Sequence, residues 1–407
     1  MNSKKLLKMM LFIINTKNIT RFLLVLFSFF LIGNSFAAQN PEDIVASKSD
    51  YLQPLYKKLF KSGQRNAVLN YMEIGSLAFK HKDLAEANIA FDNAIRNIEL
   101  IYKDDPNIEK ARSLWYEESI KDFKGEPYER VMAYYYRGLS YLIEGDVENA
   151  RAMFVGGLLQ DAFAEEKQHR ADFAIMMYLS AWSAMKMNAE HLWESSLKGY
   201  QHLRPSFPLP KPDDNVLVIV ETGKAPRKLA DGIGKYELVY RKGKKFKDKQ
   251  AQLTIKQTDT RLYPVEDLFW QASTRGGRAV DRIIKGKVQF SESSRNVGDA
   301  LSQTGNTLVE WSALGDSSNT LQGLGTAISV IGLASKMVSL NIETKADTRY
   351  WKSLPNTIHV HSFKSDNIND IQINALDKYG NVLSMKKLKT NIFPLPNKYT
   401  IIWAKSQ

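Results

Sequence analysis

Two histidines, His359 and His361, have the spacing in this sequence that is closest to that of a metal site. They lie one residue apart in the segment HVH, and alternation along a β-strand places both side chains on one face. Paired imidazoles can bind a transition metal, and the carboxylate of Asp366 follows soon after. Because two ligands alone make a weak site, we predict no metal centre here.

The other motifs that suggest chemistry are incomplete. Residues 273–278, STRGGR, contain a glycine pair but lack the lysine of a phosphate-binding loop. Residues 323–329, GLGTAIS, match a dinucleotide-binding fingerprint only loosely and follow no predicted strand. The chain has no cysteine, which excludes disulfides, thiolate zinc sites and cysteine nucleophiles. We therefore predict no catalytic residues and no cofactor.

The N-terminal residues have the pattern of a secretory signal. Five basic residues and no acid precede Glu42, an apolar run covers residues 22–32, and Ser35 and Ala37 are small residues at a cleavage site. We predict cleavage after Ala37; an uncleaved membrane anchor is the alternative. Cleavage lowers the formal net charge from +12 to +7, which is too mild to indicate nucleic acid as a partner. The expected location is the periplasm, with the outer membrane as a further association.

A repeat is visible between residues 71–91 and residues 134–154. Matching positions are 63 residues apart. The apolar spacing predicts two helices joined by a tight turn, with Asp83 and Asp146 as N-caps and Glu86 completing a capping box in the first copy. Glycine and alanine permit close helix packing, and phenylalanine fills the space between neighbouring hairpins. The signature residues are Tyr71, Gly75, Ala87, Phe91, Tyr134, Gly138, Ala150 and Phe154.

This pattern resembles the tetratricopeptide repeat, which forms helical solenoids with a concave binding face. The 63-residue offset is shorter than two consensus periods, so residues 107–123 are expected to form a shortened hairpin, and residues 171–199 a degenerate third pair. The alternative is an ordinary helical bundle with a chance echo. Three consecutive tyrosines cannot all face one core. We therefore expect exposure of one or two of them, and Tyr135 and Tyr136 are candidate contacts to a partner protein.

A proline-rich linker at residues 205–214 separates the helical domain, residues 38–204, from a β-rich domain, residues 215–407. The second domain has short apolar runs typical of strands and a turn at residues 377–380. We predict an α+β protein: a tetratricopeptide-like solenoid, then an antiparallel sandwich or partial barrel with a helical insertion at about residues 265–345. Within that insertion, residues 321–340 carry one charge and are either a buried helix or a membrane-inserting segment.

The segments GEPYERVMAYYYRGLSYLIEGDVENAR, VLVIVETGKAPRK and ADTRYWKSLPNTIHV resemble an uncharacterised family of bacterial envelope proteins. The resemblance spans most of the mature chain and implies a signal sequence, tetratricopeptide-like helices and a β-rich domain. It also implies, by association alone, a role in outer-membrane assembly or secretion. The lipidated cysteine found in many such proteins has no counterpart here, which argues against a lipid anchor.

Two functions follow from these observations. The first is a non-enzymatic protein that binds a protein partner in the envelope through its helical domain. The second is an envelope-polymer-binding protein or hydrolase with carboxylates in an interdomain cleft. The basic segment Arg241–Lys249 is a candidate for contact with anionic lipid headgroups, or else a solvated hairpin. The sequence does not specify the oligomeric state.

Overall fold

The structure is a computed structural model that describes residues 40–103, 122–162, 172–231, 237–275, 347–368, 370–395 and 398–406. The chain divides into two compact units, residues 1–53 and 54–407. In the first unit, α3 (Pro41–Ala46) is capped by the side chain of Asn40, which accepts a hydrogen bond from Glu42 N at 3.2 Å. The predicted signal peptide and the low-charge stretch at 321–340 lie outside the described residues.

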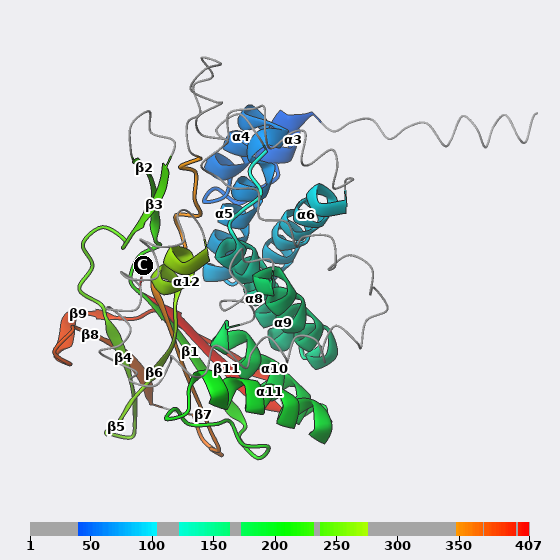
Figure 1. The fold of residues 1–407 in the computed structure, drawn as a ribbon. Helices are drawn as coiled ribbons and strands as arrows, with labels where there is room; N and C mark the ends of the chain where they lie inside the picture. The colour runs from blue at the N-terminus through cyan, green and yellow to red at the C-terminus, as the bar shows by residue number, and fades with distance from the viewer. Residues whose placement is uncertain are drawn as a thin grey trace, which may run out of the picture. The chain divides into compact units, whose positions relative to one another are not determined.

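Helices form the N-terminal part of the second unit. In chain order, α5 packs on α6, α6 on α8, α8 on α9, α9 on α10, and α10 on α11 (Figure 1). Each helix therefore contacts mainly its neighbours in the sequence. The helices are α4 (Gln53–Ser62), η1 (Gln64–Asn66), α5 (Ala67–Lys80), α6 (Leu84–Lys103), α8 (Pro127–Glu144), α9 (Val147–Ala162), α10 (Ala174–Lys186) and α11 (Glu190–Leu203).

Both predicted N-caps are confirmed. The carboxylate of Asp83 accepts a hydrogen bond from Glu86 N at 3.2 Å, and that of Asp146 accepts one from Asn149 N at 3.1 Å. These bonds satisfy backbone N–H groups that have no partner inside the helix. The carboxylate of Glu86, predicted to complete a capping box, accepts a hydrogen bond from the hydroxyl of Tyr56.

The repeat signature forms the inner contact of two helix pairs. A Cβ atom on Gly75 would lie 2.7 Å from the ring of Phe91, and one on Gly138 would lie 2.4 Å from the ring of Phe154. The glycines are therefore required for close packing, and the atoms nearest to this position of Gly138 belong to Phe154, on the same helix as Ala150. Of the eight signature residues, seven are buried and Tyr71 is half-buried.

The described residues of the C-terminal part form three sheets. Five strands pair in the order β10-β11-β1-β7-β6, four in the order β5-β4-β8-β9, and β2 pairs with β3. The strands are β1 (Val216–Thr222), β2 (Arg227–Asp231), β3 (Glu237–Arg241), β4 (Gln250–Ile255), β5 (Thr258–Arg261), β6 (Tyr263–Asp267), β7 (Thr357–Phe363), β8 (Ile371–Leu376), β9 (Val382–Lys387), β10 (Thr390–Leu395) and β11 (Tyr399–Lys405).

The five-stranded sheet is mixed, whereas the sequence predicted antiparallel pairing throughout. Strands β1 and β11 are parallel neighbours, with Val216 opposite Thr400 and Glu221 opposite Lys405. No hairpin joins these two strands, which lie at opposite ends of the β-rich region, so the antiparallel geometry that a short turn imposes does not apply.

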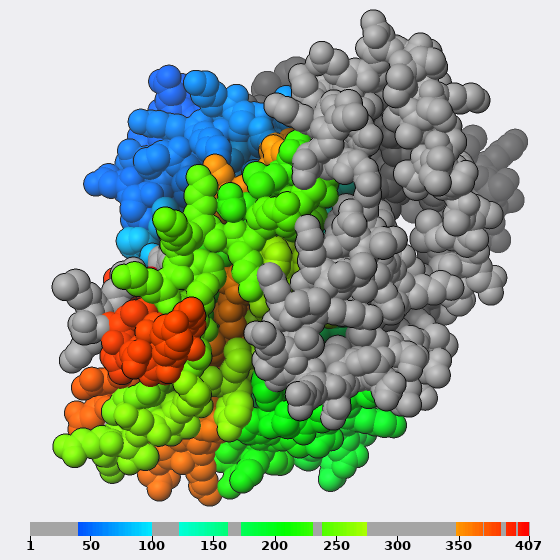
Figure 2. All heavy atoms as spheres, turned by 60° about the vertical axis from the view of Figure 1, so that its left-hand side comes forward, coloured from blue at the N-terminus to red at the C-terminus, as the bar shows by residue number. Residues whose placement is uncertain are grey.

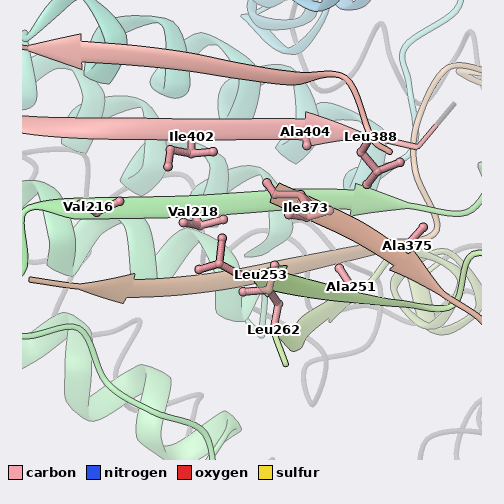
Figure 3. Close-up of a cluster of buried hydrophobic side chains, with 11 residues drawn as sticks. Val216, Val218, Ala251, Leu253, Leu262, Ile373, Ala375, Leu388, Ile402 and Ala404 are labelled. Carbon is pink, nitrogen blue, oxygen red and sulfur yellow. The ribbon is translucent and has the colours of Figure 1, made fainter. Parts of the chain in front are cut away.

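The core of this region lies between the five-stranded and the four-stranded sheet. Figure 3 shows Val216 and Val218 of β1 and Ile402 of β11 facing Leu253 of β4 and Ile373 of β8. Every residue of β1 is buried, so both of its faces are covered. Residues of β1 that alternate with this apolar set point to the opposite face, toward the helices.

Two details of the predicted β-rich domain are corrected. The helical insertion was expected from Val265, but residues 265–267 belong to β6, and α12 (Leu268–Arg275) begins after them. The basic segment Arg241–Lys249 is not a hairpin, because β3 pairs with β2 whereas β4 pairs with β5 and β8. The predicted turn at residues 377–380 joins β8 to β9, as expected, with Gly380 N donating to Asp377 O. The domain boundaries at 204–214 stay a prediction.

Candidate functional site

A buried carboxylate lies where the helices meet the five-stranded sheet. Glu221 is the last residue of β1 whose side chain points toward the helices, and this side chain is fully buried. It accepts hydrogen bonds from the hydroxyls of Tyr135 at 3.2 Å and Tyr136 at 2.6 Å, and from Trp403 Nε1 at 3.0 Å. The ammonium group of Lys405 lies 3.0 Å from the same carboxylate. Four donors thus compensate the desolvation of this buried acid.

The three consecutive tyrosines of α8 are all inside the molecule. Tyr134, Tyr135 and Tyr136 are at most 4% exposed, so the expected exposed tyrosine is not found. Helix α8 does not face a single core, because it is covered by α6, by α9 and by the sheet. Burial, followed by the charge of Glu221, raises the pKa of Tyr135 and Tyr136 well above the usual value, which keeps both hydroxyls as donors. Their contact with a partner protein stays a prediction.

The first helix of each pair faces the same sheet. Phe79 of α5 packs edge-on against Trp403 of β11, with ring centroids 5.1 Å apart. Tyr178 of α10 donates a hydrogen bond to Ser362 of β7 at 2.8 Å. The sheet therefore covers the face that α5, α8 and α10 share (Figure 1). This face would be the concave, ligand-binding side of a tetratricopeptide solenoid.

A cleft of about 640 Å³ opens beside this interface. Three stretches that line it adjoin one another on the face drawn in Figure 2: helices α4 and α5 in blue, residues 223–227 in green, and residues 350–354 in orange. The lining residues are Leu55, Glu73, Ser76, Leu77, Lys80, Gly223, Lys224, Ala225, Arg227, Lys244, Tyr350, Lys352, Ser353, Leu354 and Lys405.

The cleft is strongly basic. Among the described residues that line it, six are cationic and Glu73 is the one acid. One oxygen of Glu73 already accepts a hydrogen bond from Lys352 N at 2.7 Å. Convergent cations in a concave surface concentrate the positive potential and attract anionic groups. The cationic residues are Lys80, Lys224, Arg227, Lys244, Lys352 and Lys405.

The turn after β1 sets one wall of the cleft. Gly223 has a φ of +77°, and a Cβ atom there would lie 2.6 Å from Phe246 and 2.7 Å from Asn356. Its N–H donates to the carboxylate of Asp248 at 2.8 Å. A residue without a side chain is therefore needed for this turn, which directs the next residue, Lys224, to the opening.

Residues 350–354 form another part of the lining, next to α5. Trp351 is fully buried, and its N–H donates to the carboxylate of Glu129 at 2.7 Å. Its indole N–H donates to Ser353 Oγ at 2.8 Å, and the next N–H, of Lys352, binds Glu73. The segment is thus fixed to α5 and α8 by backbone bonds, which leaves the Lys352 side chain exposed.

The histidine pair is separate from the cleft lining. His359 is fully buried on β7, and its Nε2 lies 3.0 Å from the hydroxyl of Thr222. Burial lowers the pKa of His359 to about 4, so the imidazole is neutral at pH 7. The described residues contain no group of three or more histidine, aspartate or glutamate side chains that could hold a metal ion.

The sequence provided one partial signal for the cleft. The basic segment Arg241–Lys249 contributes Lys244 alone to the lining. The remaining cations come from stretches that are far apart in the sequence, so no local charge run marks them. No family model, curated protein or solved structure matches this chain. Within the described ranges, every helix is too short or too polar to cross a membrane.

Proposed function

We propose that this protein is a non-enzymatic binding protein that holds an acidic segment of a partner protein in the basic cleft. The observation that carries the proposal is the charge of the lining, with six cations against a single carboxylate. Carboxylates of a partner would pair with the exposed cations, Lys224, Lys244 and Lys352, at the protein surface, where each exposed pair contributes about 0.2–1 kcal/mol. Several such pairs are needed for useful affinity, and the cleft supplies several.

We further propose that the helical region is a tetratricopeptide-like stack that acts as a scaffold. Its support is the packing of the helices in chain order and the two matching contacts, Gly75 with Phe91 and Gly138 with Phe154. In this proposal the stack does not bind the partner on its concave side, since the protein's own sheet lies there. It positions α5, which forms one wall of the cleft.

The proposed location is the periplasm, with an association with the outer membrane and a role in assembly or secretion there. The support is the basic, apolar and small-residue pattern that ends at Ala37, together with the family resemblance. N-terminal sequencing of protein recovered from bacterial periplasm tests the cleavage. An intact N-terminus on membrane-bound protein would instead mean that the segment is an anchor.

A hydrolase with an interdomain cleft is the alternative, and the lining of this cleft favours binding over hydrolysis. Most enzymes that cleave sugar polymers use two carboxyl groups on either side of the scissile bond. Among the described lining residues, Glu73 has no carboxylate neighbour to form such a pair. Binding of an anionic polymer would use the same cations as an acidic protein segment, so the two are distinguished by their relative affinities in a competition titration.

The test is a binding titration of the mature protein with a fluorescent glutamate-rich peptide. The variant Lys224→Glu/Lys244→Glu/Lys352→Glu reverses three exposed charges of the cleft. Three lost pairs at about 0.5 kcal/mol each predict about tenfold weaker binding. A variant that reverses three exposed lysines outside the lining, Lys198, Lys378 and Lys389, has the same net charge and should bind as the wild type does. Equal binding by both variants would refute the proposal.

A further inference from the structure

The charges of the cleft are distributed unevenly between its opening and its floor. Lys224, Lys244 and Lys352 are exposed, whereas the side chain of Lys405 is only 7% exposed. The ammonium group of Lys405 lies 3.0 Å from the Glu221 carboxylate and 2.9 Å from the hydroxyl of Tyr136. The floor thus contains a compensated ion pair, while the excess positive charge lies at the rim.

Apolar side chains form much of the remaining floor. Leu354 and Ala225 are 2% and 4% exposed, and Leu55 and Leu77 are half-buried. Ser353 Oγ accepts a hydrogen bond from Trp351 Nε1, and among the described residues it has no acceptor for its own hydroxyl hydrogen. That hydrogen is available to a carbonyl oxygen of a ligand. The floor therefore suits an apolar group next to a peptide backbone.

We infer that the ligand is an acidic polypeptide segment with one apolar side chain, which inserts into the floor while flanking carboxylates bind the rim. This inference rests on the proposed function. A buried anion would lose its hydration without gaining a free cation, because the charge of Lys405 is already compensated by Glu221. Carboxylates at the rim remain hydrated and pair with exposed lysines. The volume of about 640 Å³ accommodates a leucine or phenylalanine together with adjoining backbone.

The origin of the cations in separate segments of the lining favours a peptide over a lipid. Lys352 lies on the wall next to α5, to which its backbone N–H is bonded through Glu73. Lys224, Arg227 and Lys244 come from two other segments, which are joined where the guanidinium group of Arg227 donates to the carbonyl of Lys242 at 3.0 Å. A peptide can carry acidic residues both before and after its apolar residue. A lipid carries its anionic group at one end.

Three labelled peptides of equal length test the inference with the mature protein. The first has a central leucine between glutamates, the second has serine in place of the leucine, and the third keeps the leucine but has glutamine in place of every glutamate. We expect the first peptide to bind at least about tenfold more tightly than either of the others. The floor variant Leu77→Ser should remove the advantage of leucine over serine and leave binding of the serine peptide unchanged. Leu55→Ser provides a second floor variant if Leu77→Ser lowers the melting temperature.

The outcomes separate the two proposals. If the leucine and serine peptides bind equally and reversal of the rim lysines weakens both, the proposed function stands and the apolar anchor is wrong. If rim reversal weakens neither peptide, the proposed function fails as well. Vesicles that contain phosphatidylglycerol serve as the competing probe. Displacement of the leucine peptide by these vesicles at lower concentration than by unlabelled peptide would overturn the inference in favour of a lipid ligand.

Discussion

The two helix pairs that carry the repeat, α5/α6 and α8/α9, share one inner contact but have different surroundings. In each pair a phenylalanine ring of the second helix packs on a glycine of the first. Outside that contact the pairs diverge, because Tyr71 is half-buried whereas Tyr134 is 4% exposed. The comparison teaches that the signature determines how a pair closes, while the elements packed around the pair determine what each outer face contacts.

The starts of the two first helices show the same difference. The N-cap of α5, Asn66, makes no capping hydrogen bond through its side chain, whose amide oxygen instead accepts a hydrogen bond from Arg349. Helix α8 begins with a reciprocal capping box between Glu126 and Glu129. Glu129 also accepts the Trp351 N–H, so this cap connects the second pair to the segment that lines the cleft. Equivalent positions in a repeat therefore need not have equivalent roles.

The largest expected difference between the pairs comes from their phenylalanines. Phe91 stacks on Tyr136 of the next pair, with centroids 5.5 Å apart, and lies 6.2 Å from the ring of Trp351. Phe91→Ala and Phe154→Ala should each lower the free energy of unfolding by about 3–5 kcal/mol. Phe91→Ala should be the more severe because it also removes a contact between pairs. Urea denaturation of the mature protein measures the unfolding free energy of both variants. A smaller loss of unfolding free energy for Phe91→Ala would contradict a stabilising contact of Phe91 with the next pair.

The glycines come next and test the inner contact directly. Gly138→Leu and Gly75→Leu should each cost about 1–3 kcal/mol, because the added side chain must displace a phenylalanine ring. Replacement of either glycine by alanine has two opposing effects. Alanine improves helix propensity by up to about 1 kcal/mol, but its Cβ atom still overlaps the phenylalanine ring. The overlap is closer at Gly138 than at Gly75, 2.4 Å against 2.7 Å.

We therefore expect Gly138→Ala to lower the melting temperature more than Gly75→Ala does. If Gly138→Leu has the melting temperature of the wild-type protein, residue 138 does not face Phe154. It would also remove the main support for the tetratricopeptide-like proposal.

Local chemistry explains which features the sequence could predict. The caps Asp83 and Asp146 act within three residues, and the glycine-to-phenylalanine spacing lies within one hairpin, so both are visible as short patterns. The strands are recognisable for the same reason, since alternation and β-branched residues mark each run.

Features that join distant segments could not be predicted in this way. Tyr136 and Glu221 are 85 positions apart, and nothing near Tyr136 indicates a carboxylate partner. The parallel pairing of β1 with β11 and the convergence of Lys80 and Lys224 on one cleft likewise depend on the tertiary fold. An exposed tyrosine was predicted from the helical period alone, and that period contains no information about a sheet on the third face of α8.

The pH dependence of the unfolding free energy can detect Glu129, which belongs to the capping box of α8 in the second pair. Burial raises the pKa of Glu129 from 4.5 to about 7, against the opposing effect of nearby Lys228. The folded protein then binds a proton that the unfolded chain releases, so this stabilisation is complete below about pH 4.5 and is lost as the pH rises toward 7. Its slope is at most about 1.4 kcal/mol per pH unit for one proton.

Glu129→Gln should reduce the fall in unfolding free energy between pH 4.5 and 7. The reduction should be partial, because burial also raises the pKa of Glu266 to about 7. The measurement is urea unfolding at several pH values in that window, with Glu73→Gln as the matched control. An unchanged pH profile for Glu129→Gln would show that residue 129 takes up no proton in this range.

The smallest expected effects belong to the two caps. Asp83→Ala and Asp146→Ala should each cost about 1 kcal/mol, because each leaves a helix N–H without its side-chain acceptor. The hydrogen bonds of Asp146 are exposed, including one that its second oxygen accepts from the Asn149 side chain at 2.7 Å. The bond from Glu86 N to Asp83 is part-buried and adjoins the contact between Tyr56 and Glu86. We therefore expect Asp83→Ala to cost slightly more. Asp83→Asn and Asp146→Asn retain an acceptor and should restore most of the stability in thermal melts. If the asparagine variants are destabilised as much as the alanine variants, the caps contribute by charge alone.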